Sequence, residues 1–168
     1  MSRFWKHSPY AEDQPYPHAI LATHVLFRGF QSGSGIGPFV GIARYLLLRR
    51  RSLPGPLLPM ILRSTGVGAA IGTGVSAVGL MARMWGREEI EWRDRSWRLL
   101  ENKGQVEVDT WGYLGVIIGV STLFATRQLR GVGWKTAVGS MGWGSTCGVV
   151  GYMIYRHGVK GGKWKDET

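Results

Sequence analysis

Side chains that could catalyse a reaction or bind a metal are few in this chain and are widely spaced. The four histidines stand at positions 7, 18, 24 and 157, without the spacing of a metal site. Three candidate nucleophiles, Ser140, Ser145 and Cys147, have no histidine or acid beside them in a catalytic pattern. We therefore expect no catalytic residue, no metal ligand and no enzymatic activity in this chain itself.

One glycine-rich segment has the spacing of a phosphate-binding loop. Residues 66–72 read GVGAAIG, which is similar to the glycine pattern of dinucleotide sites. That pattern binds a nucleotide when it follows a strand within a βαβ unit, and no strand pattern precedes it here. We expect no cofactor.

Arg28 is the charge whose position is most informative. His24 precedes it by one helical turn, and residues 29–43 after it contain no Asp, Glu, Lys or Arg. An ionisable residue inside a membrane span is a functional-site hypothesis by default. We favour the alternative that the span begins near Gly29 and that Arg28 reaches to the membrane interface.

Small residues recur at every fourth position in four apolar stretches. They are Gly29, Gly33, Gly37 and Gly41; Gly68, Gly72 and Ser76; Gly115 and Gly119; and Ser140, Gly144 and Gly148. Four residues is just over one helical turn, so each set forms a groove on one side of a helix, and such grooves let membrane helices approach closely. The spacing leaves open whether the partner helices belong to this chain or to another protein.

Apolar stretches with little charge predict the elements that carry these residues. Glycine is frequent, with 26 residues in 168, and it is tolerated in membrane helices. We predict an all-α membrane protein with a single domain, 1–168, and four glycine-rich transmembrane helices. The expected spans are 19–48, 60–83, 110–126 and 134–155, with a kink at Pro38 in the first.

A charged connection, 85–108, separates the second and third spans. Within it we predict an extramembrane helix over 87–102 that ends near Gly104. Three acid-before-base pairs four residues apart support this helix: Glu89 with Arg93, Glu91 with Arg95, and Asp94 with Arg98. Its apolar residues form no single stripe, so we expect it to pack against another protein.

Basic residues in the short connections predict the orientation. Residues 44–63 and 127–135 carry eight Lys and Arg and no acid, whereas the polar tail 1–16, the charged connection and the basic tail 156–168 are nearly balanced. Short basic loops stay on the cytoplasmic or matrix side, so both termini should lie on the opposite side. The net charge of +10 is thus explained without nucleic acid. The start of the chain lacks the pattern of a cleavable targeting signal.

Two segments resemble a known family. Residues 62–79 (LRSTGVGAAIGTGVSAVG) and 130–151 (RGVGWKTAVGSMGWGSTCGVVG) each place a basic residue before a span rich in small residues. In this they resemble the mitochondrial inner-membrane translocase (Tim) channel family, one branch of which serves as an accessory subunit in the membrane arm of respiratory complex I. Channel members usually have a short connection where this chain has residues 85–108.

A third segment, IEWRDRSWRLLENKGQVEVD at 90–109, resembles small fungal membrane proteins that we group with complex I accessory subunits. These resemblances imply a structural, non-catalytic accessory subunit of complex I in the mitochondrial inner membrane, with both termini in the intermembrane space. Its partners would be other membrane subunits and phospholipids, contacted through residues such as Arg28, Arg49, Arg50 and Arg51. The alternative is a translocase or channel component.

Overall fold

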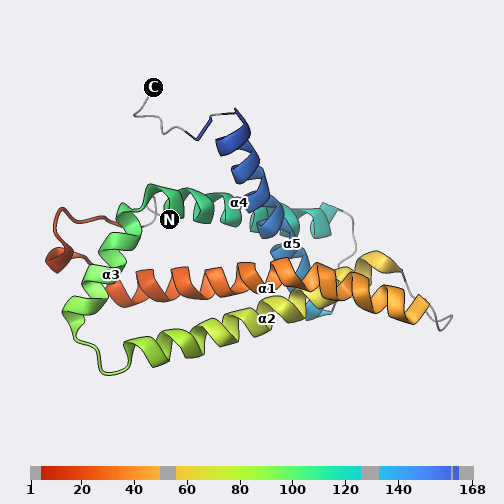
Figure 1. Cartoon of the computed structure of the whole chain (residues 1–168), viewed down its shortest axis with the longest axis horizontal. Coiled ribbons are helices and arrows are strands. Elements are labelled where there is room, and N and C mark those ends of the chain that lie inside the picture. The colour runs from red at the N-terminus through yellow and green to blue at the C-terminus, as the bar shows by residue number, and fades with distance from the viewer. Residues whose placement is uncertain (1–4, 50–55, 126–132, 160, 163–168) are drawn as a thin grey trace.

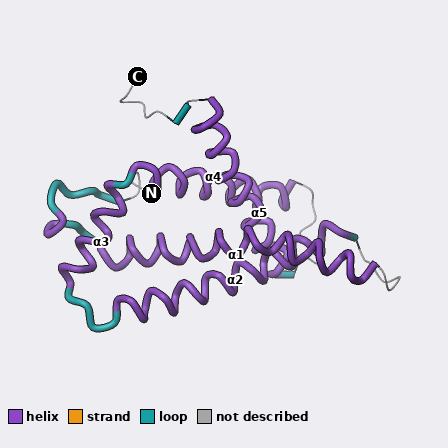
Figure 2. Tube along the Cα trace, in the orientation of Figure 1, coloured by secondary structure: helices purple, strands orange, loops and turns teal. Residues whose placement is uncertain are grey.

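The computed structural model describes residues 5–49, 56–125, 133–159 and 161–162 of the chain. Within these ranges every regular element is helical, as Figure 2 shows, so the prediction of an all-α protein is confirmed. The α-helices are α1 (Pro17–Arg49), α2 (Leu57–Met84), the shorter α3 (Glu89–Glu101), α4 (Lys103–Ala125) and α5 (Trp134–Met153). A short turn, η1 (Ala11–Asp13), precedes them, and a π-helical turn, η2 (Ile154–Val159), continues α5.

The boundary between α3 and α4 differs from the prediction. Asn102 ends α3, and its side-chain oxygen accepts a hydrogen bond from the backbone N–H of Gln105 at 3.1 Å. This is the bond of a helix N-cap, so α4 starts at Lys103, seven residues before the expected start of the third span at 110. Gly104, the expected stop of the charged helix, lies in the first turn of α4.

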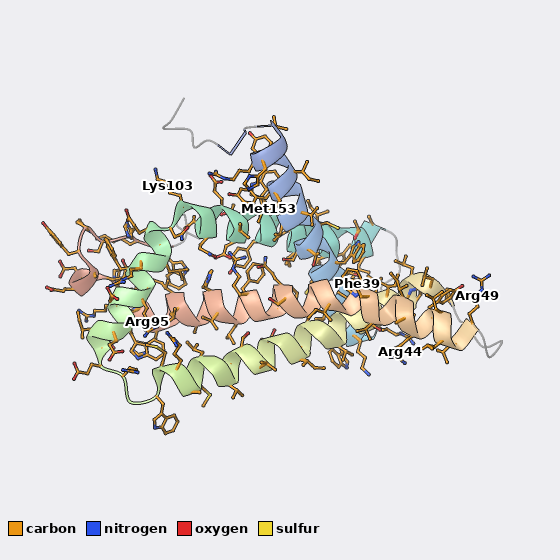
Figure 3. All side chains as sticks on the ribbon, in the orientation of Figure 1. Phe39, Arg44, Arg49, Arg95, Lys103 and Met153 are labelled. Atoms are coloured by element: carbon orange, nitrogen blue, oxygen red, sulfur yellow. The ribbon has the colours of Figure 1, made fainter. Side chains whose placement is uncertain are left out.

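Two prolines shape α1. Pro17 is its first residue, where a missing N–H costs nothing. Pro38 lies inside the helix, which continues for eleven more residues to Arg49. Beyond the labelled Phe39 the helix slopes away from the line of its first part (Figure 3), as expected where proline removes a backbone hydrogen bond.

The long helices are arranged as two antiparallel pairs. Figure 1 shows α1 and α2 side by side along the length of the molecule, and these two helices make the most extensive contact. The second pair is α4 with α5, which cross obliquely in Figure 1, and α5 also crosses α2. The short α3 closes one end, where it contacts the start of α1 and the turn η1. Arg95 of α3 and Arg49 of α1 therefore lie at opposite ends of the molecule (Figure 3).

The distribution of side chains is inverted relative to that of a water-soluble bundle. Most of the buried residues on the four long helices are Gly, Ser, Thr or Ala, whereas large apolar side chains face outward. Examples from the four helices are Phe39 (74% exposed), Val75 (67%), Ile117 (61%) and Val150 (51%). By length and apolar composition, two helices in the described part of the chain could cross a membrane, α2 and α4.

Candidate functional site: glycine packing faces and a buried polar cluster

The contact between α1 and α2 is made by backbone against backbone. The α1 glycines Gly29, Gly33, Gly37 and Gly41 face, in order, Gly72, Gly68, Thr65 and Ile61 of α2. A Cβ added to any of these four glycines would lie closer than 3 Å to backbone atoms of α2, a separation that real side chains do not show. Only glycine allows the two helices to approach this closely.

The pair α4 and α5 repeats this arrangement. Gly115 faces the carbonyl of Gly144, Gly119 faces the carbonyl of Ser140, and Gly148 faces the carbonyl of Trp111. A Cβ on any of the three glycines would overlap the carbonyl oxygen opposite it. The pairing runs in the opposite direction along the two helices, as expected for antiparallel neighbours.

All ten glycines singled out from their spacing therefore lie at contacts between helices of this one chain. They are Gly29, Gly33, Gly37, Gly41, Gly68, Gly72, Gly115, Gly119, Gly144 and Gly148. For these faces, the partner helix therefore belongs to the same chain and not to another protein. Gly68 and Gly72, which belong to the loop-like motif 66–72, lie inside a helix and contact α1.

A third glycine contact escaped the sequence pattern. Gly66 of α2 and Gly139 of α5 meet where these helices cross, and a Cβ on either would overlap the carbonyl of Lys135 or Leu62 respectively. Each lies off the four-residue series of its own helix, so spacing alone did not mark it. Conversely, Gly35 and Gly74 have no atom within 4 Å of an added Cβ and face outward.

A buried polar cluster joins α1 to α4, two helices that lie apart in Figure 1 and make little close backbone contact. Its centre is Asp109, whose side chain is 1% exposed. His24 Nδ1 lies 2.7 Å from one carboxylate oxygen, and Arg28 Nη2 lies 3.1 Å from the other. Nδ1 of His24 is therefore placed to donate a hydrogen bond to this carboxylate.

The guanidinium of Arg28 extends this cluster. It donates to the side-chain oxygen of Gln105 at 2.7 Å and to that of Gln31 at 3.0 Å. Gln31 in turn donates to Ser145 Oγ at 3.2 Å, which brings α5 into the cluster. An added Cβ at Gly112 of α4 would overlap the Gln31 amide, so this glycine makes room for the glutamine.

The structure adds a partner to the interpretation of Arg28. The helix begins at Pro17, well before Gly29, and the Arg28 side chain is 29% exposed and paired with Asp109. Arg28 immediately precedes the uncharged stretch 29–43, and Asp109 immediately precedes 110–126. The two charges thus stand at the same edge of the apolar region, where pairing lowers the cost of removing each from water. Sequence reasoning did not identify Asp109, because it lies 85 residues from His24.

The charged helix α3 packs on its own chain. Its pairs Glu89–Arg93 (3.6 Å) and Asp94–Arg98 (2.9 Å) form as predicted, whereas Glu91 pairs with Arg87 of the preceding turn at 3.3 Å. These surface pairs stabilise the helix only slightly. Its tertiary contacts are made by Trp92 and Trp97 and by charged residues such as Glu89.

Those contacts are with the N-terminal segment and the start of α1. Trp97 Nε1 donates to the Ser8 carbonyl at 2.8 Å, and its ring stacks on His7. Trp92 stacks on His18 with ring centroids 4.2 Å apart. We expected this helix to pack against another protein, but Trp92 and Trp97 pack against their own chain. The side chain of Arg98 is 73% exposed.

One carboxylate at this contact has a shifted pKa. His18 Nε2 donates to Glu89 at 2.7 Å. That hydrogen bond, assisted by the charges of His18 and Arg93, holds the pKa of Glu89 below its usual value of 4.5. The ion pair joins α1 to α3 at the end of the molecule where the N-terminal segment lies.

The remaining candidates from the sequence are dispersed. Ser140 Oγ donates to the Thr136 carbonyl of its own helix at 3.1 Å. Cys147 is exposed on α5. Arg49 is exposed at the end of α1, and Arg50 and Arg51 lie outside the described residues. In the residues described, no three His, Cys, Asp or Glu come together to hold a metal ion.

Comparison with known proteins gives one match. Residues 6–155 match the model of a protein family described as "Protein of unknown function (DUF1757)". The matched region starts in the N-terminal segment and contains all five α-helices. No curated protein and no solved structure matches the chain.

Proposed function

The chain belongs to the DUF1757 family, and we propose that it is a non-catalytic structural subunit of a membrane assembly, with four membrane-spanning helices. The assembly that its sequence resembles most specifically is the membrane arm of mitochondrial NADH:ubiquinone oxidoreductase, complex I. Several features support this proposal, and the antiparallel pairing of the helices carries it.

The pairing supports four spans in place of two. Helices α2 and α4 have the length and composition to cross a membrane. Gly29 to Gly41 of α1 follow α2 in antiparallel contact, and Gly148 to Ser140 of α5 follow α4 in the same way. A helix in backbone contact with a membrane span over this distance shares its membrane depth. Glycine and serine lower the mean hydropathy of α1 and α5, so these two helices are less apolar in composition than α2 and α4.

The outward-facing apolar side chains also support membrane insertion. Ile71 and Val78 of α2 and Ile118 of α4 are each more than 60% exposed. An apolar surface distributed over four helices would aggregate in water, whereas lipid or neighbouring membrane subunits would cover it. Lipid also requires polar side chains to be buried among hydrogen-bond partners, and Gln31 and Ser145 are placed in this way inside the bundle.

The charges support the proposed orientation. Arg44 and Arg49 lie at the end of the molecule opposite α3 (Figure 3). Both residues belong to the short basic connection 44–63, which the positive-inside rule assigns to the matrix. We therefore propose the inner mitochondrial membrane, with α3 and both termini in the intermembrane space. There the exposed face of α3, including Arg98, would contact neighbouring subunits.

A translocase or channel component is the alternative, and the packing argues against it. Three hydroxyls that could line a channel bond instead to their own helices: Thr73 to the Ala69 carbonyl, Ser121 to that of Ile117, and Thr122 to that of Gly119. The faces between paired helices are filled by glycine backbone. This interior is suited to rigidity more than to conduction.

Native electrophoresis of mitochondrial membranes solubilised in mild detergent tests the assignment, with the chain located by mass spectrometry. Co-migration with NADH dehydrogenase activity is the expected result. Migration with protein-import components would overturn it in favour of the alternative. Migration as a small free oligomer would exclude both assemblies.

A further inference from the structure

A groove of about 430 Å³ follows one side of the contact between α1 and α2. Its floor is glycine backbone, including Gly33 and Gly68. Its walls are apolar side chains, Ile36 and Val40 from α1 and Val67, Ile71 and Val75 from α2. The groove is thus mostly apolar along its length and is open on one side.

One end of this groove is polar and basic. Arg44 is the last groove residue on α1, and Ser64 is the first on the antiparallel α2. The hydroxyl of Ser64 is buried, with the residue 7% exposed, and has no hydrogen-bond partner in the structure. A buried hydroxyl without a partner costs about 1–3 kcal/mol, so this group indicates a ligand that accepts a hydrogen bond.

The charge at this end favours an anion. Residues 14–87 contain no Asp or Glu, so no acid on α1 or α2 neutralises Arg44. Arg63, which is exposed, adds to the positive field at this end. A phosphate matches these groups, because it accepts from a guanidinium in the bidentate manner and from a hydroxyl at the same time.

We propose that the groove binds an anionic phospholipid, with its phosphate at Arg44 and Ser64 and one acyl chain along the glycine floor. The proposal rests on the membrane insertion proposed above. From Arg44 to Gly29 the groove follows fifteen residues of α1, about 22 Å at 1.5 Å per residue. One leaflet is about 15 Å deep, half of a hydrocarbon core of about 30 Å. An acyl chain that starts at the basic end therefore reaches most of the groove.

Native mass spectrometry of the full-length chain tests the site. The protein is reconstituted in vesicles of phosphatidylcholine with one quarter phosphatidylglycerol, extracted in mild detergent, and its retained lipids are counted. Two variants alter the groove: Arg44→Gln removes the guanidinium that is proposed to bind the phosphate, and Ile71→Trp fills the apolar part of the groove. Two matched controls leave it intact: Arg49→Gln removes a charge at the same end, and Val78→Trp enlarges an exposed α2 side chain outside the groove.

We expect the unaltered chain to retain phosphatidylglycerol in preference to phosphatidylcholine. Arg44→Gln should lose this retention about tenfold, as expected for one charge-assisted contact of about 1.4 kcal/mol. Ile71→Trp should lose it because the larger side chain excludes the acyl chain, and both controls should keep it. Equal retention of the two lipids, or an equal loss in Arg49→Gln, would overturn the site. Flotation of each variant with pure phosphatidylcholine vesicles is measured separately, and a failure of the unaltered chain to float would instead overturn membrane insertion.

Discussion

His24 Nδ1 donates a hydrogen bond to Asp109 Oδ2 at 2.7 Å, although the two residues are 85 positions apart in the chain. With Arg28 on the other carboxylate oxygen, this bond connects the α1–α2 pair to the α4–α5 pair at one edge of the apolar region. Glycine contacts hold each pair together. The polar cluster and the crossing of α2 with α5 together position one pair relative to the other.

The cluster should behave as a coupled unit when it is mutated. Asp109→Leu leaves Arg28 without its counter-charge, so we expect the free energy of unfolding in detergent micelles to fall by about 3–5 kcal/mol. Arg28→Met in the same chain should recover a large part of this loss, because the unpaired charge is then gone. Additive losses in this double-mutant cycle would show that the two side chains do not interact.

A methyl group at the α1–α2 contact should destabilise the bundle. The Cβ of Gly33→Ala would overlap the backbone of Gly68, and backbone cannot move aside as a flexible side chain can. We expect a loss of about 1–3 kcal/mol, measured by chemical denaturation in micelles. Gly35→Ala is the matched control two residues away, where an added Cβ meets nothing within 4 Å. It should cost nothing and could add up to about 1 kcal/mol of helix propensity. Equal losses in both variants would refute backbone contact as the cause.

The crossing of α2 and α5 should be as sensitive as the paired faces. Gly139→Ala would place a Cβ against the Leu62 carbonyl, and we expect it to lower the unfolding temperature, whereas Gly74→Ala should leave it unchanged. Thermal unfolding followed by circular dichroism measures both. An unchanged unfolding temperature in Gly139→Ala would show that this crossing is loose in solution.

Acid should release the start of α1 from α3. The pKa of Glu89 is lowered by its bond to His18, so folded protein holds this carboxylate ionised more strongly than unfolded protein does. The stabilisation of the folded protein by the ionised Glu89 carboxylate is complete above the unfolded pKa near 4.5. It is lost as the pH falls through the lower pKa of the folded protein. Hydrogen exchange of α3 should therefore rise below about pH 4.5. Glu89→Gln should raise exchange at neutral pH and remove this pH dependence, and a dependence that persists in Glu89→Gln would assign it to another group.

The N-terminal segment should depend on one tryptophan. Trp97→Phe keeps the ring stacked on His7 but removes the hydrogen bond to the Ser8 carbonyl. We expect faster proteolysis within residues 5–16 and unchanged protection of α1. Arg98→Gln, at an exposed position on the same helix, should leave the cleavage rate unaltered. A cleavage rate in Trp97→Phe equal to that of the unaltered chain would show that the hydrogen bond does not hold the segment.

Local periodicity was enough to predict the helices and the ten packing glycines. Apolar stretches with little charge place α1, α2 and α5 within three residues at each end, and the four-residue spacing marks Gly33 and Gly115 without reference to a partner. Contacts that depend on how helices cross were not predictable. Gly139 lies outside its helix's series, and Asp109 pairs with residues far away in the chain. Gln105 was assigned to the charged connection because the capping role of Asn102 becomes visible only when α3 and α4 are both in place.

The most direct test of the account is the side of the membrane on which three single cysteines lie. In a Cys147→Ser chain, Tyr10→Cys marks the N-terminal segment, Arg98→Cys marks α3 and Gly133→Cys marks the start of α5, all at exposed positions. Mitoplasts are treated with a membrane-impermeant maleimide before and after permeabilisation. Four spans predict that Tyr10→Cys and Arg98→Cys react at once and that Gly133→Cys reacts only after permeabilisation. If only α2 and α4 cross, Tyr10→Cys and Gly133→Cys will lie together on the side opposite Arg98→Cys, and that result would contradict the four-helix bundle.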